Sequence, residues 1–259
     1  MLSYQHSFHA GNGADVHKHA LLAAAMAYLA RKQKPFSYIE THAGRGLYRI
    51  DSPEALKTGE AAAGVSRLEA RIPKDHPWRQ AIDAARAEHG ATTYPGSPWI
   101  AAHLARADDR LDLAELHPAE HAALVQAMPP RPGLRIHRRD GLEMAKALTP
   151  PDPRRGLMLI DPSWEVRDDY ARIATLLPAL HRKWNVGVLM LWYPILADSR
   201  HAPMIRTLRD TLPELMISEV SLPPARIGHG LRGSGMAVVN PPWGLQDEAV
   251  RIATFIEQS

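Results

Sequence analysis

The sequence predicts an α/β fold, a mostly parallel, doubly wound sheet of seven strands with a small helical insertion. Three observations predict it. Gly156–Ile160 is an uninterrupted apolar run, as expected of a central parallel strand buried on both faces. Other strand-like runs alternate with helical segments along the chain. Residues 51–93 are polar and rich in Ala, Arg and Glu, which indicates helices outside the sheet.

The first third of the chain predicts one long helix, one strand and the insertion. Val16–Arg31 consists of good helix formers, and Pro35 ends that pattern. Phe36–Glu40 is β-like and is followed by a glycine-bearing turn. The insertion predicts two helices, at 58–72 and 77–90, separated by a proline-containing link. We expect residues 1–50 and 94–259 to form the main domain and residues 51–93 a helical insertion subdomain.

The rest of the chain alternates between helices and strands. Tyr94–Pro98 opens a helix, and another helix follows Pro118. Further helices are expected at 142–148, 169–180 and 202–211. The remaining strands are expected at 110–115, 134–137, 156–160, 186–192, 215–222 and 235–240, the last of which is the final predicted element. Strands that alternate with helices in this way form a parallel sheet.

The composition excludes several classes of protein. With 259 residues, 45% of them hydrophobic, the chain is long enough for one large α/β domain and too apolar to be disordered throughout. It has no cysteine, which rules out disulfides, thiolate zinc sites and cysteine nucleophiles. No apolar stretch is long enough to span a bilayer, and the start lacks a signal-peptide pattern. We expect a cytoplasmic protein without membrane contact.

The charge pattern suits a phosphate-rich partner without requiring one. The formal net charge is only +3, but 14 histidines and three basic clusters can make one face positive. Those clusters are Arg31/Lys32/Lys34, Arg135/His137/Arg138/Arg139 and Arg154/Arg155. Clusters of this kind are more often solvated surfaces than nucleic-acid sites.

Acidic residues and glycines follow three of the predicted strands, at the positions where open α/β sheets bind ligands. Glu40 ends the first strand, before the Gly44 turn. A carboxylate at Glu115 can accept hydrogen bonds from a ribose diol, and one at Asp140, before Gly141, can accept them from an adenine amine. Each is equally well or better explained as an ordinary turn or a solvated strand end. Their order along the chain is more specific than any one of them.

Asp161-Pro162-Ser163-Trp164 follows the central strand and resembles the Asp/Asn-Pro-Pro-aromatic motif of methyltransferases that modify an amine of adenine, cytosine or glutamine. An exocyclic amine is a poor nucleophile while its lone pair is conjugated with the ring. Hydrogen bonds from its two protons to Asp161 and the Pro162 carbonyl localise that lone pair, and Trp164 offers a face to an unstacked base. The alternative interpretation is an Asp N-cap and a proline that opens a helix.

A second segment, Asn240-Pro241-Pro242-Trp243, matches the same motif more closely in its letters. Its position argues against it, because it follows the last predicted strand. Asp161 follows the fourth strand, which we expect beside the glycine-turn strand at the centre of the sheet. We therefore place the reaction centre at Asp161 and expect Asn240 at the end of the terminal strand, near the site.

This succession resembles motifs I to IV of class I methyltransferases, and the chain as a whole is similar to the RlmJ family of bacterial 23S ribosomal RNA adenine-N6 methyltransferases. The similarity runs from residue 1 to about residue 243. It rests on the segments Met1–His19, Thr41–Gly44, Tyr94–Pro98, Glu115–Pro118, Leu191–Pro194 and Ser234–Trp243.

The resemblance implies a Rossmann-like enzyme that transfers a methyl group from S-adenosylmethionine to N6 of a specific adenine in 23S ribosomal RNA. It implies reaction-centre roles for Asp161, Pro162 and Trp164. The RNA-side residues it suggests are Tyr4, Lys18 and Trp164. Its implied cofactor contacts are His19, His42, Ser97, Glu115, Asp140, Gly141 and Asp161. The residues alone point to Glu115, Asp140 and Asp161 among these, but not to the histidines.

The sequence departs from the family pattern at one loop. The family motif is Asp-Pro-Pro-Tyr, whereas this chain has Ser163 and Trp164 at the last two positions. Tryptophan keeps the stacking face, and Ser163 removes a restraint on φ. We expect activity to survive, either slower or with a shifted substrate preference.

Two other functions stay open at this point. One is an amine methyltransferase that acts on DNA or on a protein glutamine, and the other is a non-catalytic RNA-binding protein that has kept the fold. We expect a monomer that uses no metal and binds 23S ribosomal RNA.

Overall fold

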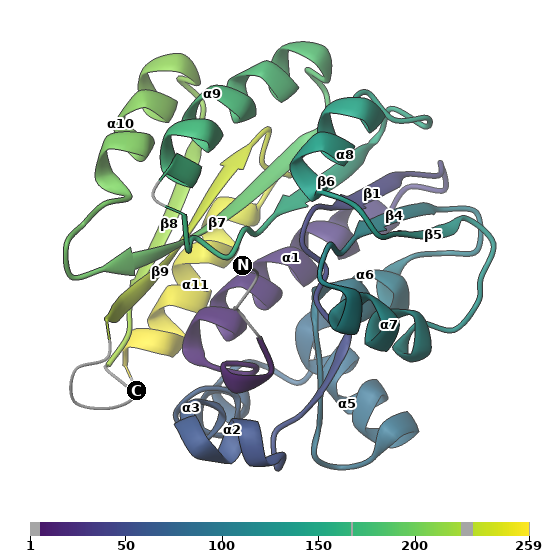
Figure 1. Cartoon of the computed structure of the whole chain (residues 1–259), viewed down its shortest axis with the longest axis vertical. Helices are drawn as coiled ribbons and strands as arrows, with labels where there is room; N and C mark the ends of the chain where they lie inside the picture. The colour runs from purple at the N-terminus through teal and green to yellow at the C-terminus, as the bar shows by residue number, and fades with distance from the viewer. Residues whose placement is uncertain (1–5, 167, 224–229, 259) are drawn as a thin grey trace.

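Seven strands form the central sheet of the computed structural model, which describes residues 6–166, 168–223 and 230–258 (Figure 1). They are β1 (Ser37–Glu40), β4 (Arg110–Ala114), β5 (Leu134–His137), β6 (Gly156–Ile160), β7 (Val188–Leu196), β8 (Met216–Ser221) and β9 (Leu231–Val239). The order is β5-β4-β1-β6-β7-β9-β8, in which β9 is antiparallel to both of its neighbours and the other pairs are parallel. The predicted mostly parallel, seven-stranded sheet is confirmed.

The centre of the sheet is buried on both faces, as the apolar run at β6 predicts. Leu157 and Leu159 contribute to one apolar cluster, and Met158 and Ile160 to a second cluster on the other face. All four side chains have no exposed surface. Because β6 pairs with β1 on one side and β7 on the other, the residues that follow it emerge at the middle of the sheet edge.

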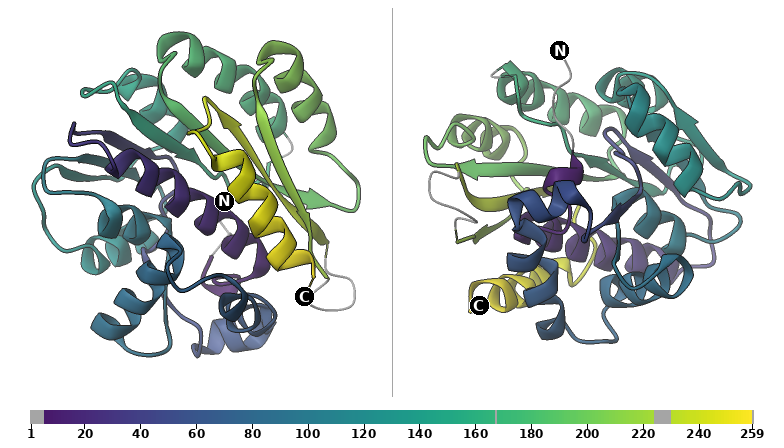
Figure 2. Two further views of the ribbon diagram at one scale, coloured as in Figure 1. Left: turned by 180° about the vertical axis from the view of Figure 1, so that it is seen from behind. Right: turned by 60° about the horizontal axis from the view of Figure 1, so that its bottom comes forward.

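Helices cover both faces (Figure 1). On one face lie α8 (Gly141–Leu148), α9 (Asp168–Lys183) and α10 (Ala202–Thr211). On the other lie α1 (Gly13–Ala30), α6 (Ser97–Leu104), α7 (Pro118–Ala127) and α11 (Leu245–Glu257). Figure 2 shows α1 and α11 side by side across the back of the sheet. The C-terminal helix α11 is not anticipated by the sequence analysis, which ends its last element at residue 240.

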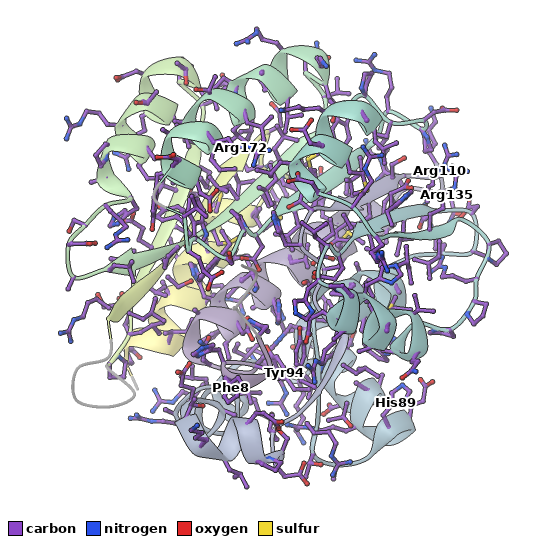
Figure 3. The ribbon with its side chains drawn as sticks, in the orientation of Figure 1. Phe8, His89, Tyr94, Arg110, Arg135 and Arg172 are labelled. Carbon is purple, nitrogen blue, oxygen red and sulfur yellow. The ribbon has the colours of Figure 1, made fainter. Side chains whose placement is uncertain are left out.

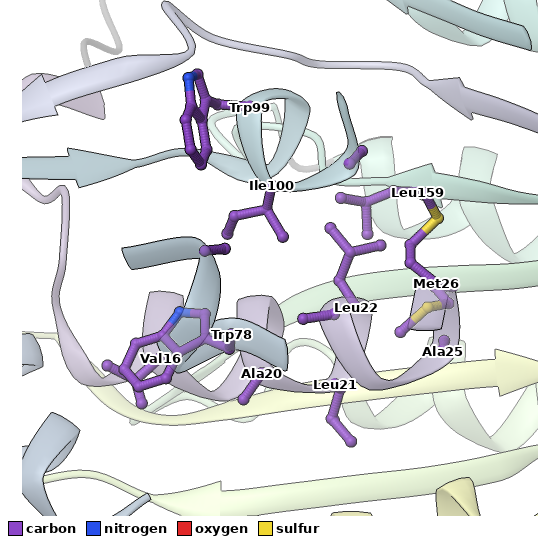
Figure 4. Close-up of a cluster of buried hydrophobic side chains, with 14 of the residues drawn as sticks. Val16, Ala20, Leu21, Leu22, Ala25, Met26, Trp78, Trp99, Ile100 and Leu159 are labelled. Carbon is purple, nitrogen blue, oxygen red and sulfur yellow. The ribbon is translucent and has the colours of Figure 1, made fainter. Parts of the chain in front are cut away.

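Helix α1 is almost entirely buried, and that is why its sequence lacks a polar face. Val16, Leu21, Leu22 and Met26 have no exposed surface. Figure 4 shows them in one cluster with Trp78, Ile100 and Leu159, which come from three other parts of the chain. At the start of α1 the Asn12 side chain accepts a hydrogen bond from the Asp15 backbone N–H, which caps the helix. A short 3-10 helix, η1 (His6–Phe8), precedes it.

The insertion is helical, but the single helix expected at 58–72 is wrong. It is divided into α2 (Pro53–Thr58), α3 (Glu60–Ala63), α4 (Val65–Leu68) and η2 (Glu69–Arg71), followed by the expected α5 (Pro77–His89). Gly59 adopts φ +69° and ends α2 with a left-handed cap. A Cβ at Gly64 would lie 2.1 Å from the Gly11 carbonyl oxygen, so α3 and α4 pack tightly on the N-terminal segment.

A small antiparallel pair at the base of the insertion is also not anticipated. β2 (Leu47–Arg49) pairs with β3 (Thr93–Pro95). Strands of three residues carry too little alternation to be recognised in a sequence. They bring the two ends of the insertion together beside the main sheet, and Trp78 and Ile82 of α5 pack in the same apolar cluster as α1.

Candidate active site

A cleft of about 470 Å³ lies along the carboxyl ends of the central strands, where open α/β sheets bind ligands. Its size suits a ligand of nucleoside dimensions. Of the site residues expected from the sequence, Tyr4 lies outside the described residues. All the others line this cleft: Lys18, His19, His42, Ser97, Glu115, Asp140, Gly141, Asp161, Pro162 and Trp164.

The sheet order arranges the lining residues along the cleft. Asp140, Glu115 and Gly44 follow β5, β4 and β1, and together they form what we call the acidic half. Asp161 follows β6. Beyond it, the lining side chains of β7 and β9 are apolar; this apolar half consists of Trp192, Pro194, Leu196 and Leu231. Asp161 therefore stands between the two halves.

Lys18 reaches Asp161 from α1. Its Nζ lies 2.6 Å from Asp161 Oδ2 and 3.0 Å from Asp15 Oδ1. Burial opposes a charged lysine, but the two carboxylates outweigh it and hold the pKa of Lys18 above its ordinary value. The ammonium therefore fixes the Asp161 carboxylate through one oxygen. Asp161 Oδ1 has no protein hydrogen-bond partner among the described residues and is available to a substrate amine.

The segment Asp161–Trp164 is an irregular loop, and α9 begins only at Asp168. The alternative interpretation as an N-cap and first helical turn is therefore wrong. Trp164 adopts φ +57°, in the left-handed region that non-glycine residues seldom occupy. Backbone conformations of this kind concentrate at functional sites, where the surrounding packing holds them.

The Trp164 ring is more buried than a free stacking platform would be. Only 5% of the residue is exposed, and the ring packs against Tyr170 at a centroid distance of 4.5 Å. Its indole N–H has no hydrogen-bond partner among the described residues. Trp164 thus borders the cleft mainly as part of the apolar cluster under α9. Stacking of a base on its ring stays a prediction.

Glu115 is held at the end of β4 by backbone donors. Its Oε2 accepts from the Gly44 N–H at 2.9 Å, and its Oε1 accepts from the His117 N–H at 2.7 Å. Burial raises the pKa of Glu115. Each oxygen keeps a lone pair that can accept a hydroxyl proton, as binding of a ribose diol requires. Gly44 has φ +62°, and a Cβ there would lie 2.4 Å from the Tyr48 hydroxyl, which explains the glycine.

Asp140 and Gly141 join β5 to α8. The Asp140 side chain caps α8 by accepting from the Glu143 N–H at 2.9 Å, and it remains partly exposed at the cleft. Arg172, labelled on α9 in Figure 3, lies 3.9 Å from its Oδ1. A Cβ at Gly141 would lie 1.7 Å from the Thr41 carbonyl oxygen. Only glycine therefore allows α8 to start this close to the turn after β1.

Of the two histidines expected at the cofactor site, His19 is buried and His42 is only partly buried. Burial lowers the pKa of His19 to about 3 and also lowers the pKa of His42. His19 Nδ1 forms a hydrogen bond with the Tyr94 hydroxyl at 2.9 Å, and Figure 3 shows Tyr94 below the N-terminal segment. His42 Nδ1 pairs with Thr41 Oγ1 at 2.8 Å. His19 Nε2 lies 3.9 Å from Asp15 Oδ1.

Ser97 and Glu40 form a buried pair beneath the cleft. Ser97 donates to Glu40 Oε1, and the Tyr38 hydroxyl donates to Glu40 Oε2 at 2.8 Å. Burial raises the pKa of Glu40 to about 8. The Ser97 hydroxyl is therefore committed to Glu40, and its contribution to the cleft lies at the N-terminus of α6.

Asn240 lies at the opposite edge of the sheet, so its expected place near the site is wrong. β9 runs antiparallel to β7, and its C-terminal end therefore meets the start of β7. There the Asn240 amide donates to the backbone oxygens of Asn185 and Gly187 at 2.9 and 2.8 Å. Trp243 beside it is 83% exposed. The choice of Asp161 over Asn240 agrees with this topology.

Several residues of the cleft are not predicted by the sequence, and two of them lie beside Lys18. Asp15 is 2% exposed and binds the Lys18 ammonium, and in the sequence it looks like an ordinary acidic residue in the first turn of a helix. Trp192 lies in the apolar half, within the family-like segment Leu191–Pro194, but no role was assigned to it. Neither has a spacing or motif that marks it as part of a site.

The cleft is lined by groups that form hydrogen bonds and carry charge. Within the described ranges no cluster of three or more His, Asp or Glu side chains is arranged to hold a metal ion. The same part of the chain contains no helix long and apolar enough to cross a membrane. The geometry of acidic strand ends around Asp161 fits a nucleoside in the acidic half, with its reactive end near Asp161.

The comparisons with known proteins cover nearly the whole chain. The family described as "RsmJ: Ribosomal RNA large subunit methyltransferase D, RlmJ" matches residues 33–259. "Ribosomal RNA large subunit methyltransferase J" of Escherichia coli (strain K12) is 36% identical over 260 residues, which are 99% of this chain and 93% of that protein. The protein of the same description from Haemophilus influenzae is 36% identical over 265 residues, covering 100% and 94% of the two chains.

A solved structure has a similar fold over nearly the whole chain. The crystal structure of a protein from Legionella pneumophila has a TM-score of 0.87 and 31% identity, and the match covers 96% of this chain and 94% of that one. With the family match and the two relatives, it leads to one conclusion: this chain belongs to the RlmJ family of ribosomal RNA large subunit methyltransferases.

Proposed function

We propose that this protein transfers the methyl group of S-adenosylmethionine to N6 of a specific adenine in 23S ribosomal RNA. The chain is a methyltransferase of large-subunit ribosomal RNA by its family. The observation that carries the proposal is the position of Asp161: it follows the central strand β6, between the acidic half and the apolar half of one cleft.

The acidic half suits the cofactor. Glu115, held by two backbone N–H groups, would accept hydrogen bonds from the ribose diol, and Asp140 would bind the adenine amine. S-adenosylmethionine supplies an electrophilic methyl group on a positively charged sulfur. The expected contacts of His19, His42, Ser97 and Gly141 with it belong to this proposal, and they are supported by their place in the cleft lining.

Asp161 and Pro162 act on the substrate amine. Asp161 Oδ1 and the Pro162 carbonyl would accept the two N6 protons, which localises the nitrogen lone pair toward the methyl group. Lys18 holds Asp161 oriented through Oδ2. The amine would keep both protons while its nitrogen takes the methyl group from the sulfur, which leaves S-adenosylhomocysteine, and the positively charged nitrogen would then lose one proton to water. Asp161 therefore does not need to remove a proton before methyl transfer.

The proposal extends to the partner and the compartment. We place Tyr4, Lys18 and Trp164 on the RNA side, and we propose a monomer that works in the cytoplasm without a metal. Incubation with methyl-labelled S-adenosylmethionine and separate RNA, DNA and protein fractions tests the substrate class. Label in N6-methyladenine of 23S ribosomal RNA is expected, and label in DNA or protein glutamine would contradict the proposal.

Substitution of Asp161 tests the reaction centre. We expect Asp161→Ala to abolish N6-methyladenine formation while the affinity for S-adenosylhomocysteine changes less than about tenfold, since a transition-state contact is lost. Asn240→Ala is the matched control, because Asn240 lies at the other edge of the sheet, and it should keep measurable activity. Mass spectrometry of digested ribosomal RNA reads both. Normal turnover by Asp161→Ala, or an exchange of the two results, would refute the assignment.

A further inference from the structure

Trp192 is a second tryptophan at the cleft, and its setting differs from that of Trp164. It lies on β7, where Ile160 of β6 pairs with Leu191. Asp161 and Trp192 each come one residue later, so they are neighbours across the two strands. The Lys18 ammonium connects them, since its Nζ lies 2.6 Å from Asp161 Oδ2 and 5.4 Å from the centre of the Trp192 ring. Trp192 is only partly buried, whereas Trp164 is covered.

The Trp192 indole is held from behind by a chain of buried polar side chains. Its Nε1–H donates to Ser234 Oγ at 2.9 Å. His17 Nδ1 lies 2.9 Å from the same oxygen, and His17 Nε2 lies 2.9 Å from Ser218 Oγ. His17 and Ser234 have no exposed surface, and Ser218 is 7% exposed. Three side chains, from α1, β8 and β9, thus orient one edge of the Trp192 ring.

The N–H and O–H groups of these hydrogen-bonded side chains can all be satisfied in one arrangement. Burial lowers the pKa of His17 to about 3, so its ring is neutral and offers one donor and one acceptor. Ser234 already accepts from the indole, and its own O–H is used when it donates to His17 Nδ1. His17 Nε2–H then donates to Ser218. A buried polar side chain destabilises the folded protein unless its hydrogen-bonding groups have partners. Here Ser234 and the indole N–H are partners only while the Trp192 ring keeps this orientation.

We propose that Trp192 is the aromatic wall against which the target base packs when its amine reaches Asp161, and that Ser234 and His17 position its indole. The inference rests on the proposed function and names the residues that receive the base. The rest of the apolar half, Pro194, Leu196 and Leu231, completes an apolar recess on the side of Asp161 away from the acidic half. A base removed from its stack needs such a surface.

Substitution of the ring tests the contact. Loss of a base–aromatic contact costs roughly 5- to 150-fold in binding. We expect Trp192→Ala to lower kcat/KM for 23S ribosomal RNA at least about tenfold, while Trp192→Phe keeps most of it and S-adenosylhomocysteine affinity stays within about twofold in both. Trp243→Ala is the matched control, because that ring is exposed at the opposite edge of the sheet. Trp192→Ala with wild-type kcat/KM would overturn the proposal.

A double-mutant cycle tests the positioning role. Ser234→Ala removes the acceptor of the indole N–H, and Trp192→Phe removes the N–H itself. If Ser234 acts through Trp192, Ser234→Ala lowers kcat/KM in the wild-type background and has little further effect in the Trp192→Phe background. A purely structural effect of Ser234→Ala would be the same in both backgrounds, and additive losses would overturn the positioning role. The melting temperature of each variant checks that it folds.

The wild-type reaction separates this inference from the proposed function. If wild-type protein places no methyl group on adenine N6 of ribosomal RNA, the proposed function fails. If wild-type protein does so and Trp192→Ala matches it while Asp161→Ala is inactive, only the role of Trp192 fails. Loss of RNA methylation by Trp192→Ala with retained S-adenosylhomocysteine binding supports both.

Discussion

Removal of the Lys18 charge should cost far more stability than removal of a surface lysine charge. The Lys18 side chain is 5% exposed, and those of its partners Asp15 and Asp161 are 3% and 14% exposed. Lys18→Met keeps the apolar stem and removes the ammonium that contacts both carboxylates. Breaking a buried ion pair from one side costs roughly 3–5 kcal/mol. We take about 3 kcal/mol, because Asp161 borders the cleft.

Thermal unfolding measures this loss. For a chain of this length, 1 kcal/mol corresponds to roughly 2–4 °C in Tm, so Lys18→Met should melt about 6–12 °C below wild type at neutral pH. The matched control is Lys146→Met, because Lys146 pairs with Glu143 at 2.8 Å on the surface, with about half of each side chain exposed. Its Tm should not change measurably.

The effect should also depend on pH in a defined direction. Burial opposes ionisation of Asp15, but His6, Lys18 and His19 outweigh it and hold the pKa of Asp15 below its ordinary value. A carboxylate with a lowered pKa contributes stability above its unfolded pKa and loses it as the pH falls. The gap between wild type and Lys18→Met should therefore be full at pH 7 and narrow below about pH 4. Equal melting shifts for the Lys18 and Lys146 variants would refute the reasoning.

Two further substitutions test the packing around the cleft. Burial raises the pKa of Glu40 to about 8, so the folded protein holds this proton while the unfolded chain releases it near 4.5, and wild-type stability should fall as the pH rises between these values. The difference in Tm between Glu40→Gln and wild type should shift in favour of Glu40→Gln as the pH rises from 5 to 8. Parallel Tm profiles would contradict this. Gly141→Ala should lower the free energy of unfolding by about 3 kcal/mol or more in denaturant titrations, because its Cβ would meet the Thr41 oxygen at 1.7 Å. Gly230→Ala is the control, because a Cβ there would meet no atom of the described residues within 4 Å; equal midpoints for the two variants would exclude the steric explanation.

Strands with a strong local signal could be predicted from the sequence. Gly156–Ile160 and Leu134–His137 have the expected bounds, because an apolar or alternating run between charged residues has only one good placement in a sheet. The helix at 58–72 could not be predicted, because its interruptions depend on Gly59 and on contact of Gly64 with Gly11. That contact is made by residues more than 50 positions apart.

Some residues of the candidate site could be predicted from the sequence, and others could not. Glu115, Asp140 and Asp161 could be found from the sequence, because each follows a recognisable strand and the carboxyl ends of parallel strands meet at one edge. His19, His42 and Ser97 came only from the family resemblance. Nothing local distinguishes a histidine that lines a cleft from one that is buried in a core, and His17 and His19 of the same helix illustrate both cases.

The sequence by itself determined the sheet, the family and the carboxylates at the strand ends, because these depend on local periodicity and on motifs a few residues long. Only the tertiary structure shows where the two proline-containing motifs and the two cleft tryptophans lie relative to one another. The reversal of β9 sends Asn240 to the far edge, Tyr170 covers Trp164, and His17 with Ser234 holds Trp192 beside Asp161. The direction of a strand and the burial of a ring depend on contacts between distant segments, which a linear pattern does not contain.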